Sequence, residues 1–179
     1  MIEIKVDIKN VTDSLERLER ANANMAPLML ELSETLYAAV MQNFEENGRP
    51  HWMGLDPKTV ASRNKSRHSM EDGSMSILQR SGALKNSIVA QHDSHSAVVG
   101  VATGRGADKY AAIHQFGGKT KPHVIQAKNK KALAFGGIFR KSVNHPGSNI
   151  PARPFLSLTD TDEDKILRSV NDYLRSVVG

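Results

Sequence analysis

Apolar residues recur at helical spacing in three stretches of the chain. The clearest stretch starts after Pro27 and stops at Asn47-Gly48, and its apolar stripe consists of Leu28, Leu32, Leu36, Val40 and Phe44. A first helix is predicted from a Thr12 cap, with Leu15, Leu18 and Ala21 on one face. A last helix is predicted from Asp160, because acidic residues stabilise the positive end of a helix. Its apolar face consists of Ile166, Leu167, Val170, Leu174, Val177 and Val178.

Alternation of apolar and polar residues predicts strands elsewhere. Residues 2–8 alternate strictly, and residues 88–92 and 97–102 are rich in β-branched side chains around a polar turn. Two further strands, at 124–127 and 132–135, flank a basic turn. We therefore predict an α+β fold in one domain, 1–179: an N-terminal strand and two helices, a small antiparallel sheet, and a C-terminal helix.

The middle of the chain predicts shorter elements. Asp56-Pro57 can start a short helix near residues 58–64, and Ser81 can cap another that carries Leu84 and Ile88. Trp52 and Leu55 are expected to anchor the segment after the long helix to the core. The polar residues 62–76 predict a flexible loop.

A short motif centred on residues 109–118 predicts a helix that two glycines stop. Tyr110, Ile113 and Phe116 share one face at helical spacing, and Gly117 and Gly118 suit the left-handed backbone that closes a helix. Together with Leu84 they form the predicted motif core. Their side chains either pack beneath the sheet or form part of a working surface.

The charge of the chain is strongly polarised. The 179 residues carry a net charge of +5, and mean hydropathy is −0.41. Residues 1–47 hold four basic and nine acidic residues, whereas residues 109–159 hold nine basic and none that are acidic. A chain with opposite signs at different places can bind copies of itself or a polyanion.

Composition and motifs give little support to an enzyme or a membrane protein. Without cysteine there is no disulfide or thiolate metal site, and no apolar run reaches the roughly 20 residues that span a bilayer. The start of the chain lacks the pattern of a signal peptide, which predicts synthesis and assembly in a cytoplasm.

Known motifs for phosphate, calcium and metal binding are incomplete in this sequence. Residues 117–120 lack the first glycine of a phosphate-binding loop, since Ile113 stands there, and residues 160–171 lack the glycine and glutamate of a calcium loop. His92 with His95, and His114 with His123, lack a third ligand at a recognisable spacing. No catalytic, cofactor or metal residue is predicted, and no residue stands out for a hydrolase.

The basic segment predicts a contact surface. Its lysines and arginines are not interleaved with aromatic residues as a base-stacking platform requires, so any contact with DNA would be to the backbone and independent of sequence. A plain solvated face is the alternative. The residues concerned are Lys119, Lys121, Lys128, Lys130, Lys131, Arg140 and Lys141.

Three motifs occur in order: Leu78-x-x-Ser81-Gly82-x-Leu84, Tyr110-Ala111-x-Ile113-His114-x-Phe116-Gly117-Gly118, and Ile150-Pro151-Ala152-Arg153-Pro154-Phe155-Leu156. With Trp52, Thr59, Arg63 and the acidic C-terminal helix, this set resembles the virion morphogenesis (tail completion) family of tailed bacteriophages and Mu-like prophages. The resemblance covers nearly the whole chain. The long polar segment 62–76 departs from it.

The resemblance implies a non-enzymatic structural protein that completes the tail or joins it to the head. Such a protein is expected in the virion tail or neck, as a ring of possibly six copies around the DNA channel. Its partners would be itself, tail-tube proteins and neck or head-connector proteins, with possible contact to DNA. The prolines of the third motif hold it extended, so Ile150, Arg153, Phe155 and Leu156 are the predicted assembly interface. An internal salt bridge is the alternative for Arg153.

Overall fold

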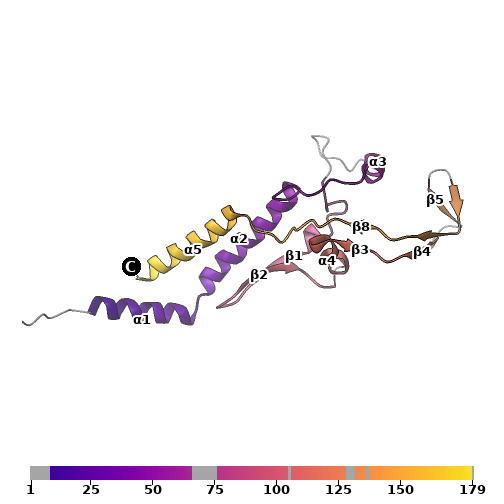
Figure 1. Ribbon diagram of the computed structural model, residues 1–179. Coiled ribbons are helices and arrows are strands. Elements are labelled where there is room, and N and C mark those ends of the chain that lie inside the picture. The colour runs from indigo at the N-terminus through magenta and orange to yellow at the C-terminus, as the bar shows by residue number, and fades with distance from the viewer. Residues whose placement is uncertain (1–8, 66–75, 105, 128–131, 136–137, 179) are drawn as a thin grey trace, which may run out of the picture.

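The computed structural model describes residues 9–65, 76–104, 106–127, 132–135 and 138–178. The molecule is elongated, with helices at one end and a narrow β arm at the other (Figure 1). We call the described residues from Gly118 to Ile150 the arm and the remaining described residues the body.

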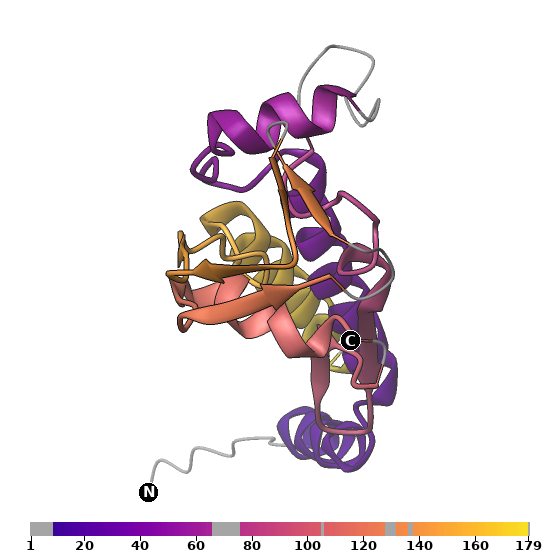
Figure 2. The same ribbon diagram turned by 90° about the vertical axis from the view of Figure 1, so that its right-hand side faces the viewer.

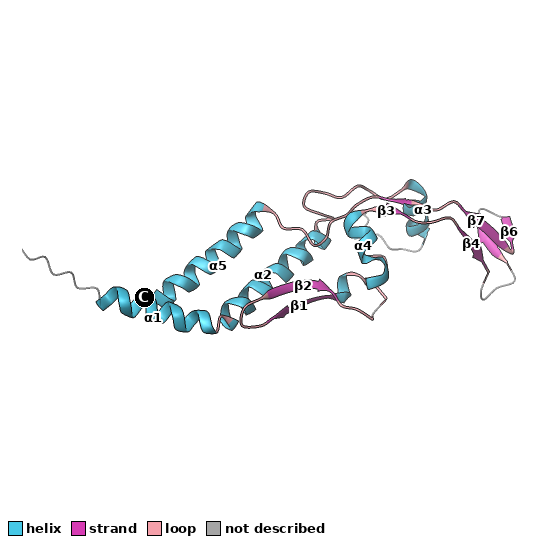
Figure 3. Ribbon diagram, turned by 60° about the horizontal axis from the view of Figure 1, so that its bottom comes forward, coloured by secondary structure: helices cyan, strands magenta, loops and turns pink. Residues whose placement is uncertain are grey.

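Three long helices form one end of the body. They are α1 (Lys9–Ala23), α2 (Ala26–Glu45) and α5 (Asp160–Val178). Helix α2 is the middle layer: α5 lies on one side of it and the β1–β2 hairpin on the other (Figure 3), while α1 packs against α5. Helices α2 and α5 form where the sequence predicts them, and Leu28, Val40 and Phe44 of the predicted α2 stripe are buried, whereas Leu167, Leu174 and Val178 of the predicted α5 face are exposed. Helix α1 begins at Lys9 rather than next to Thr12, and Leu15 of its predicted face is exposed.

The β1–β2 hairpin agrees with the predicted strands almost to the residue. β1 (Ile88–His92) pairs antiparallel with β2 (Ala97–Val101), with Ile88 opposite Val101. The Asp93 carboxylate accepts the backbone N–H groups of His95 and Ser96 and so closes the turn. A 3₁₀ turn, η1 (Lys85–Ser87), leads into β1 where the sequence predicted a short helix.

The core lies where α2 meets the segments around it. The Phe44 ring lies 5.6 Å from that of Phe155 and contacts Trp52 edge-on at 6.0 Å. These aromatic rings are buried together with Leu84 and Ile88. Residues from three distant parts of the sequence therefore share one cluster, which fixes the segments between them by apolar burial.

The arm is one long antiparallel hairpin with an interruption. β3 (Gly118–Lys119) pairs with β8 (Asn149–Ile150), and β4 (His123–Gln126) pairs with β7 (Ser142–His145) in the same register. Figure 2 looks along the molecule from the end that carries the arm. Beyond β4 and β7, β5 (Leu133–Phe135) pairs with β6 (Ile138–Arg140) in a shifted register.

Two prolines account for the interruption. The shared register places Pro122 opposite Pro146, and neither residue has an N–H group to donate. The backbone pairing continues on the body side of the gap, where the Thr120 N–H donates to the Ser148 carbonyl at 2.9 Å. Gly147 is required here, because a Cβ atom would lie 2.1 Å from the Thr120 carbonyl oxygen.

The remaining elements are two short helices, α3 (Pro57–Lys65) and α4 (Asp108–Phe116), both at predicted places. The predicted α+β class is confirmed, but the antiparallel pairs within the described residues form four separate two-stranded sheets. The predicted strand at residues 2–8, and residues 128–131 of the basic turn, lie outside the described residues. Of the predicted loop 62–76, residues 62–65 belong to α3, and 66–75 are not described.

Candidate functional site

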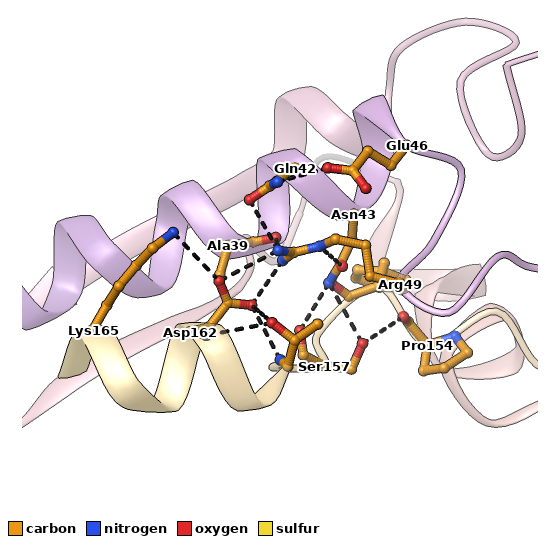
Figure 4. Close-up of polar contacts among 11 residues, drawn as sticks. Ala39, Gln42, Asn43, Glu46, Arg49, Pro154, Ser157, Asp162 and Lys165 are labelled. Carbon is orange, nitrogen blue, oxygen red and sulfur yellow. Dashed lines mark hydrogen bonds and ion pairs between the residues drawn. The ribbon is translucent and has the colours of Figure 1, made fainter. Parts of the chain in front are cut away.

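A buried ion pair holds α2, α5 and the segment after α2 together (Figure 4). Arg49 Nη2 lies 2.9 Å from Asp162 Oδ2, and both side chains are almost wholly buried. The other guanidinium N–H groups donate to the side chains of Asn43 and Gln42 and to the Ala39 carbonyl. A buried charge is tolerated when it is paired and hydrogen-bonded, which is the case here.

Asp162 also caps α5. Its carboxylate accepts the Thr159 N–H and hydroxyl, while the Asp162 N–H faces the Thr159 hydroxyl, an arrangement like a capping box. Burial by itself raises the pKa of Asp162, but the hydrogen bonds from Thr159 and Arg49 and the Arg49 charge outweigh it and hold that pKa below its ordinary value.

Asn43 extends this network to the third motif. Its Nδ2 atom donates to the carbonyls of Phe155 at 3.0 Å and Ser157 at 2.8 Å. Asn43 is fully buried in the middle of an apolar helical stripe. A polar residue on that face was the signal in the sequence for a buried network, but the carbonyl groups that its Nδ2 atom contacts are more than 100 residues away and could not be assigned.

Phe155 has a different role from the one predicted. The sequence predicted an apolar plug for a neighbouring molecule, but the Phe155 side chain is 0% exposed and packs on Phe44. The surrounding chain fixes it further, since its N–H donates to Gln115 and its carbonyl accepts from Asn43. Phe155 is therefore a core residue, and the prediction that it contacts a neighbour is corrected.

Arg153 is likewise engaged within the chain. Arg153 is 7% exposed, and its guanidinium donates to the backbone carbonyls of Met53 and Gly54. In the described chain these contacts take the place of the internal salt bridge that was the alternative prediction. Ile150 is half-buried at the base of the arm, in β8. Of the four residues of the predicted assembly interface, Leu156 is the one whose side chain is classed as exposed.

Helix α4 presents a different face to the core than predicted. Ala107 and Ala111 are buried, Ile113 is half-buried, and Tyr110 and Phe116 are exposed, Phe116 by 79%. The prediction that Tyr110 and Phe116 belong to a motif core is therefore corrected, whereas Leu84 is buried as predicted. Small residues four apart mark the buried face because α4 approaches its neighbours closely there.

The two glycines after α4 have the predicted positive φ angles, 72° at Gly117 and 157° at Gly118. A Cβ atom on Gly117 would lie 2.8 Å from the Ala152 nitrogen, so the backbones of the second and third motifs touch there. The Arg153 N–H donates to the His114 carbonyl at 2.7 Å, and Gln115 Oε1 accepts the N–H groups of Phe155 and Leu156. Gln115, which the sequence analysis passed over, thus joins the two motifs.

Residues of all three motifs line one pocket of about 190 Å³. Arg63 comes from α3, Tyr110 and His114 from α4, and Arg153 from the third motif. Burial, and then the Arg153 charge, lower the pKa of His114. Burial also lowers the pKa of Arg63 and of Arg153, with a further contribution from neighbouring arginines.

The arm carries the described part of the predicted basic surface. Lys119, Lys121, Arg140 and Lys141 are exposed, and within the described chain none of them forms an ion pair. Lys128, Lys130 and Lys131 lie outside the described residues. The same arm exposes apolar side chains that the sequence analysis did not single out, namely Val124, Ile125, Ile138 and Phe139.

Phe139 is the most exposed of these apolar side chains, at 74%. Near it, a hollow of about 410 Å³ runs between β6 and β7, lined by Ile138, Arg140 and Val143 among others. The arm strands pack chiefly on one another, so these side chains lack cover from the body. A mixed apolar and basic surface of this kind is typical of a contact region.

Metal and membrane sites find no support in the described structure. His114 lies in the pocket lined by residues of the three motifs, which we call the motif pocket. His123 lies on the arm, where the His123 ring stacks on the His145 ring at 5.1 Å. Among the described residues, no group of three or more His, Asp or Glu side chains is arranged to hold a metal ion. None of the described helices has the length and hydropathy that crossing a bilayer requires.

Comparison with known proteins gives the family. A model of the phage virion morphogenesis family matches residues 6–175. Mu-like prophage FluMu G protein 2 of Haemophilus influenzae is 35% identical over 179 residues, which cover 99% of this chain and 99% of that protein. No solved structure matches this chain. The resemblance carried by the three motifs is thereby confirmed, and the chain belongs to the phage virion morphogenesis family.

Proposed function

We propose that this protein is a non-enzymatic building block of the phage tail that completes the tail or joins it to the head. It acts as a ring of identical copies around the DNA channel. Its membership of a virion morphogenesis family and its similarity to a Mu-like prophage protein support a role in phage assembly. The protein is then part of the virion, in the tail or neck, after assembly in the host cytoplasm.

The observation that carries the proposal is the exposed arm. A two-stranded hairpin alone is only marginally stable in water, and this one exposes large apolar side chains far from the body. In the sequence, Phe139 is followed by Arg140 and Lys141, and residues 109–159 contain no acidic residue. Burial of such a surface against another subunit would stabilise both the arm and the assembly.

A second copy of the chain offers a complementary surface. The helical end of the body is acidic, and a hollow of about 400 Å³ between α2 and β1 is lined by Glu34, Tyr37, Ile88, Val89 and Ala90. A basic, apolar arm from one copy and an acidic, apolar hollow on the next make a heterologous contact. Contacts of that type close into rings when the rotation between copies allows it. Opposite charges favour this orientation over the alternatives.

The remaining exposed surfaces are assigned to other partners. Leu156 and Phe116 lie near the junction of arm and body, and tail-tube and neck or head-connector proteins are the proposed partners there. The long helices also expose apolar side chains, among them Leu15 on α1 and Leu167 on α5. Apolar patches rimmed by charge are typical of sites that bind other proteins.

The ring is tested by substituting Phe139. Phe139→Asp is expected to weaken association by roughly 2 kcal/mol or more, about 30-fold in affinity, as for an aromatic anchor of an interface. Phe139→Leu is the matched control and should retain most of the association. The measurements are light scattering coupled to size-exclusion chromatography, electron microscopy of the particles, and phage yield after complementation.

Because Phe139 is exposed, both variants should unfold at the wild-type temperature. Rings and phage yield that survive Phe139→Asp unchanged would refute the role of the arm in assembly. Loss of rings in both variants, with normal folding, would instead point to a contact that depends on aromatic shape, and Phe139→Tyr would then restore assembly.

DNA binding is a second candidate function, favoured by the four exposed cations of the arm. In that case isolated protein binds duplex DNA of any sequence, with an affinity that falls steeply as salt concentration rises. Replacing Lys119, Lys121, Arg140 and Lys141 by Gln should then abolish binding and flatten the salt dependence. Rings that form while DNA binding is absent would leave self-assembly as the role of the arm.

A further inference from the structure

The motif pocket concentrates positive charge in a partly enclosed space. Arg63, Arg80 and Arg153 all line it, and guanidinium groups keep their charge at any physiological pH. Among the residues that the structure describes, none that lines the pocket is Asp or Glu. Within the described chain, neither Arg80 nor Arg153 forms an ion pair. Arg153 is 7% exposed, and a buried positive charge is costly unless hydrogen bonds or an anion offset it.

Two of the lining groups retain hydrogen-bonding capacity. Arg153 uses Nε and Nη2 on the carbonyls of Met53 and Gly54, which leaves the two N–H groups of Nη1 without a hydrogen bond inside the described chain. His114 Nδ1 is buried and has no hydrogen-bond partner among the described residues. Buried polar atoms normally have partners, so an unpartnered one beside a pocket indicates a missing group.

The size of the pocket restricts what that group can be. A volume of about 190 Å³ holds roughly six water molecules at about 30 Å³ each. A carboxylate or a phosphate group fits inside with a few waters, whereas the remainder of a larger molecule that carries such a group would lie outside the pocket. Arg80 is exposed at the rim, so a ligand can reach the buried Arg153 from solvent.

We propose that this pocket binds a small oxyanion, either a phosphate or the carboxylate of a neighbouring copy, through Arg80 and Arg153 with His114 beside it. Planar guanidinium groups bind both oxyanions by paired hydrogen bonds. The evidence for this site comes from the pocket within one chain, so the site does not depend on the formation of a ring. Its occupation would tie the segment that carries Arg80, helix α4 and the third motif to one ligand.

The direct test is titration of the full-length protein with sodium phosphate at pH 7, against sodium chloride at matched ionic strength. The histidine side-chain resonances of labelled protein report on His114, and a saturable shift of its ring signals is expected with phosphate. Thermal unfolding should move to higher temperature over the same concentration range. A His114 signal that responds equally to phosphate and chloride would overturn the proposal.

Variants locate the site. Arg80→Gln should weaken phosphate binding about tenfold, as expected for loss of a charge-assisted hydrogen bond, while Arg80→Lys should weaken it less. Arg175→Gln removes a cation from the exposed end of α5 and should leave binding unchanged. Because Arg80 is exposed, the variants should fold normally. Equal phosphate affinity in wild type and Arg80→Gln would overturn the assignment.

A second readout uses the titration of His114. Burial and the Arg153 charge lower the pKa of His114, so a bound anion should raise that pKa towards its ordinary value. The charged neighbours that line the pocket with it are Arg63, Arg80 and Arg153, and Tyr110 contacts the ring edge-on. A pKa of His114 that is the same with and without phosphate would contradict occupation of the pocket.

Acetate distinguishes the two sources of the oxyanion. If acetate competes with phosphate, and if phosphate lowers the share of oligomers in wild type but not in Arg80→Gln, the ligand is the carboxylate of a neighbouring copy. If acetate fails to compete and oligomers are unaffected by phosphate, the site is selective for phosphate. If Arg80→Gln assembles normal rings, the pocket binds phosphate and does not bind a neighbouring copy. The proposed function of the arm is not affected by that result.

Discussion

In the body, the ion pair of Arg49 with Asp162 and the aromatic cluster around Phe44 find their partners within the chain, whereas in the arm large apolar and charged side chains face solvent. Arg49 is held by Asp162 and by three further acceptors, and Phe155 has no exposed surface. Phe139 and Lys141, on the arm, are exposed. The contrast indicates that substitutions in the body act on folding, while substitutions in the arm act on association.

The largest expected effect separates two phenylalanines. Phe155→Ala should lower the free energy of unfolding by about 3–5 kcal/mol, because a fully buried ring leaves a cavity beside Phe44. Phe139→Ala, the control on the arm, should change it by no more than about 0.5 kcal/mol. Urea unfolding followed by circular dichroism measures both. Equal destabilisation by the two substitutions would remove the distinction between body and arm.

A second contrast concerns two cations close to Asp162. Arg49→Met leaves a buried carboxylate without its main partner, which should cost about 3 kcal/mol of stability. Lys165 lies 3.9 Å from the same carboxylate, but its side chain is 53% exposed. Lys165→Met should therefore cost no more than about 0.5 kcal/mol. Similar midpoints of urea unfolding for the two variants would show that the buried pair contributes little.

Acid should weaken the body through Asp162. In the folded protein the pKa of Asp162 lies below its ordinary value, so on acidification the unfolded chain takes up the proton first. The stabilisation by the ionised Asp162 side chain is therefore fully present above about pH 3.9. It is lost as the pH falls through the native pKa, with a slope of at most about 1.4 kcal/mol per pH unit. Asp162→Asn lacks this dependence on pH. The difference in free energy of unfolding between wild type and Asp162→Asn should therefore decrease as the pH falls below about 5. A difference that stays constant would contradict the assignment.

The smallest effect on folding is expected from the arm cations. Gln at Lys119, Lys121, Arg140 and Lys141 should leave the free energy of unfolding within about 0.5 kcal/mol of wild type, because exposed charges without ion pairs contribute little. The same variant should lose affinity for an acidic partner, measured by light scattering or by binding to DNA. A large loss of stability would mean that the arm cations interact with the body.

Local patterns predicted the local elements well. The apolar stripe of α2, the acidic start of α5 and the β-branched residues of β1 and β2 each carry their signal within a few turns or residues. The ordered motifs predicted the family. These signals need no knowledge of which segments meet in space.

Pairing over long distances could not be predicted in the same way. Phe155 and Tyr110 are both aromatic residues in motifs, yet one is buried and the other exposed, because burial depends on what α2 and α4 place beside them. The sequence predicted two arm strands, 124–127 and 132–135, on either side of a basic turn, whereas β4 pairs with β7 and β5 with β6. The equal spacing of Pro122 and Pro146 from the two ends of the arm becomes meaningful only once this register is known. Arg80 and Arg153 are 73 positions apart and share a pocket only after folding.

The facing prolines at Pro122 and Pro146 have a consequence for how the arm can be recognised. A free strand edge invites other chains to extend the sheet, and an uninterrupted ladder of this length would risk fibrous polymerisation. The facing prolines divide the arm into short paired segments, and the exposed Lys119 and Lys121 precede Pro122 in the chain, so extension of the sheet by another backbone is disfavoured. Partners must recognise the arm by its side chains, which limits growth to assemblies of defined geometry.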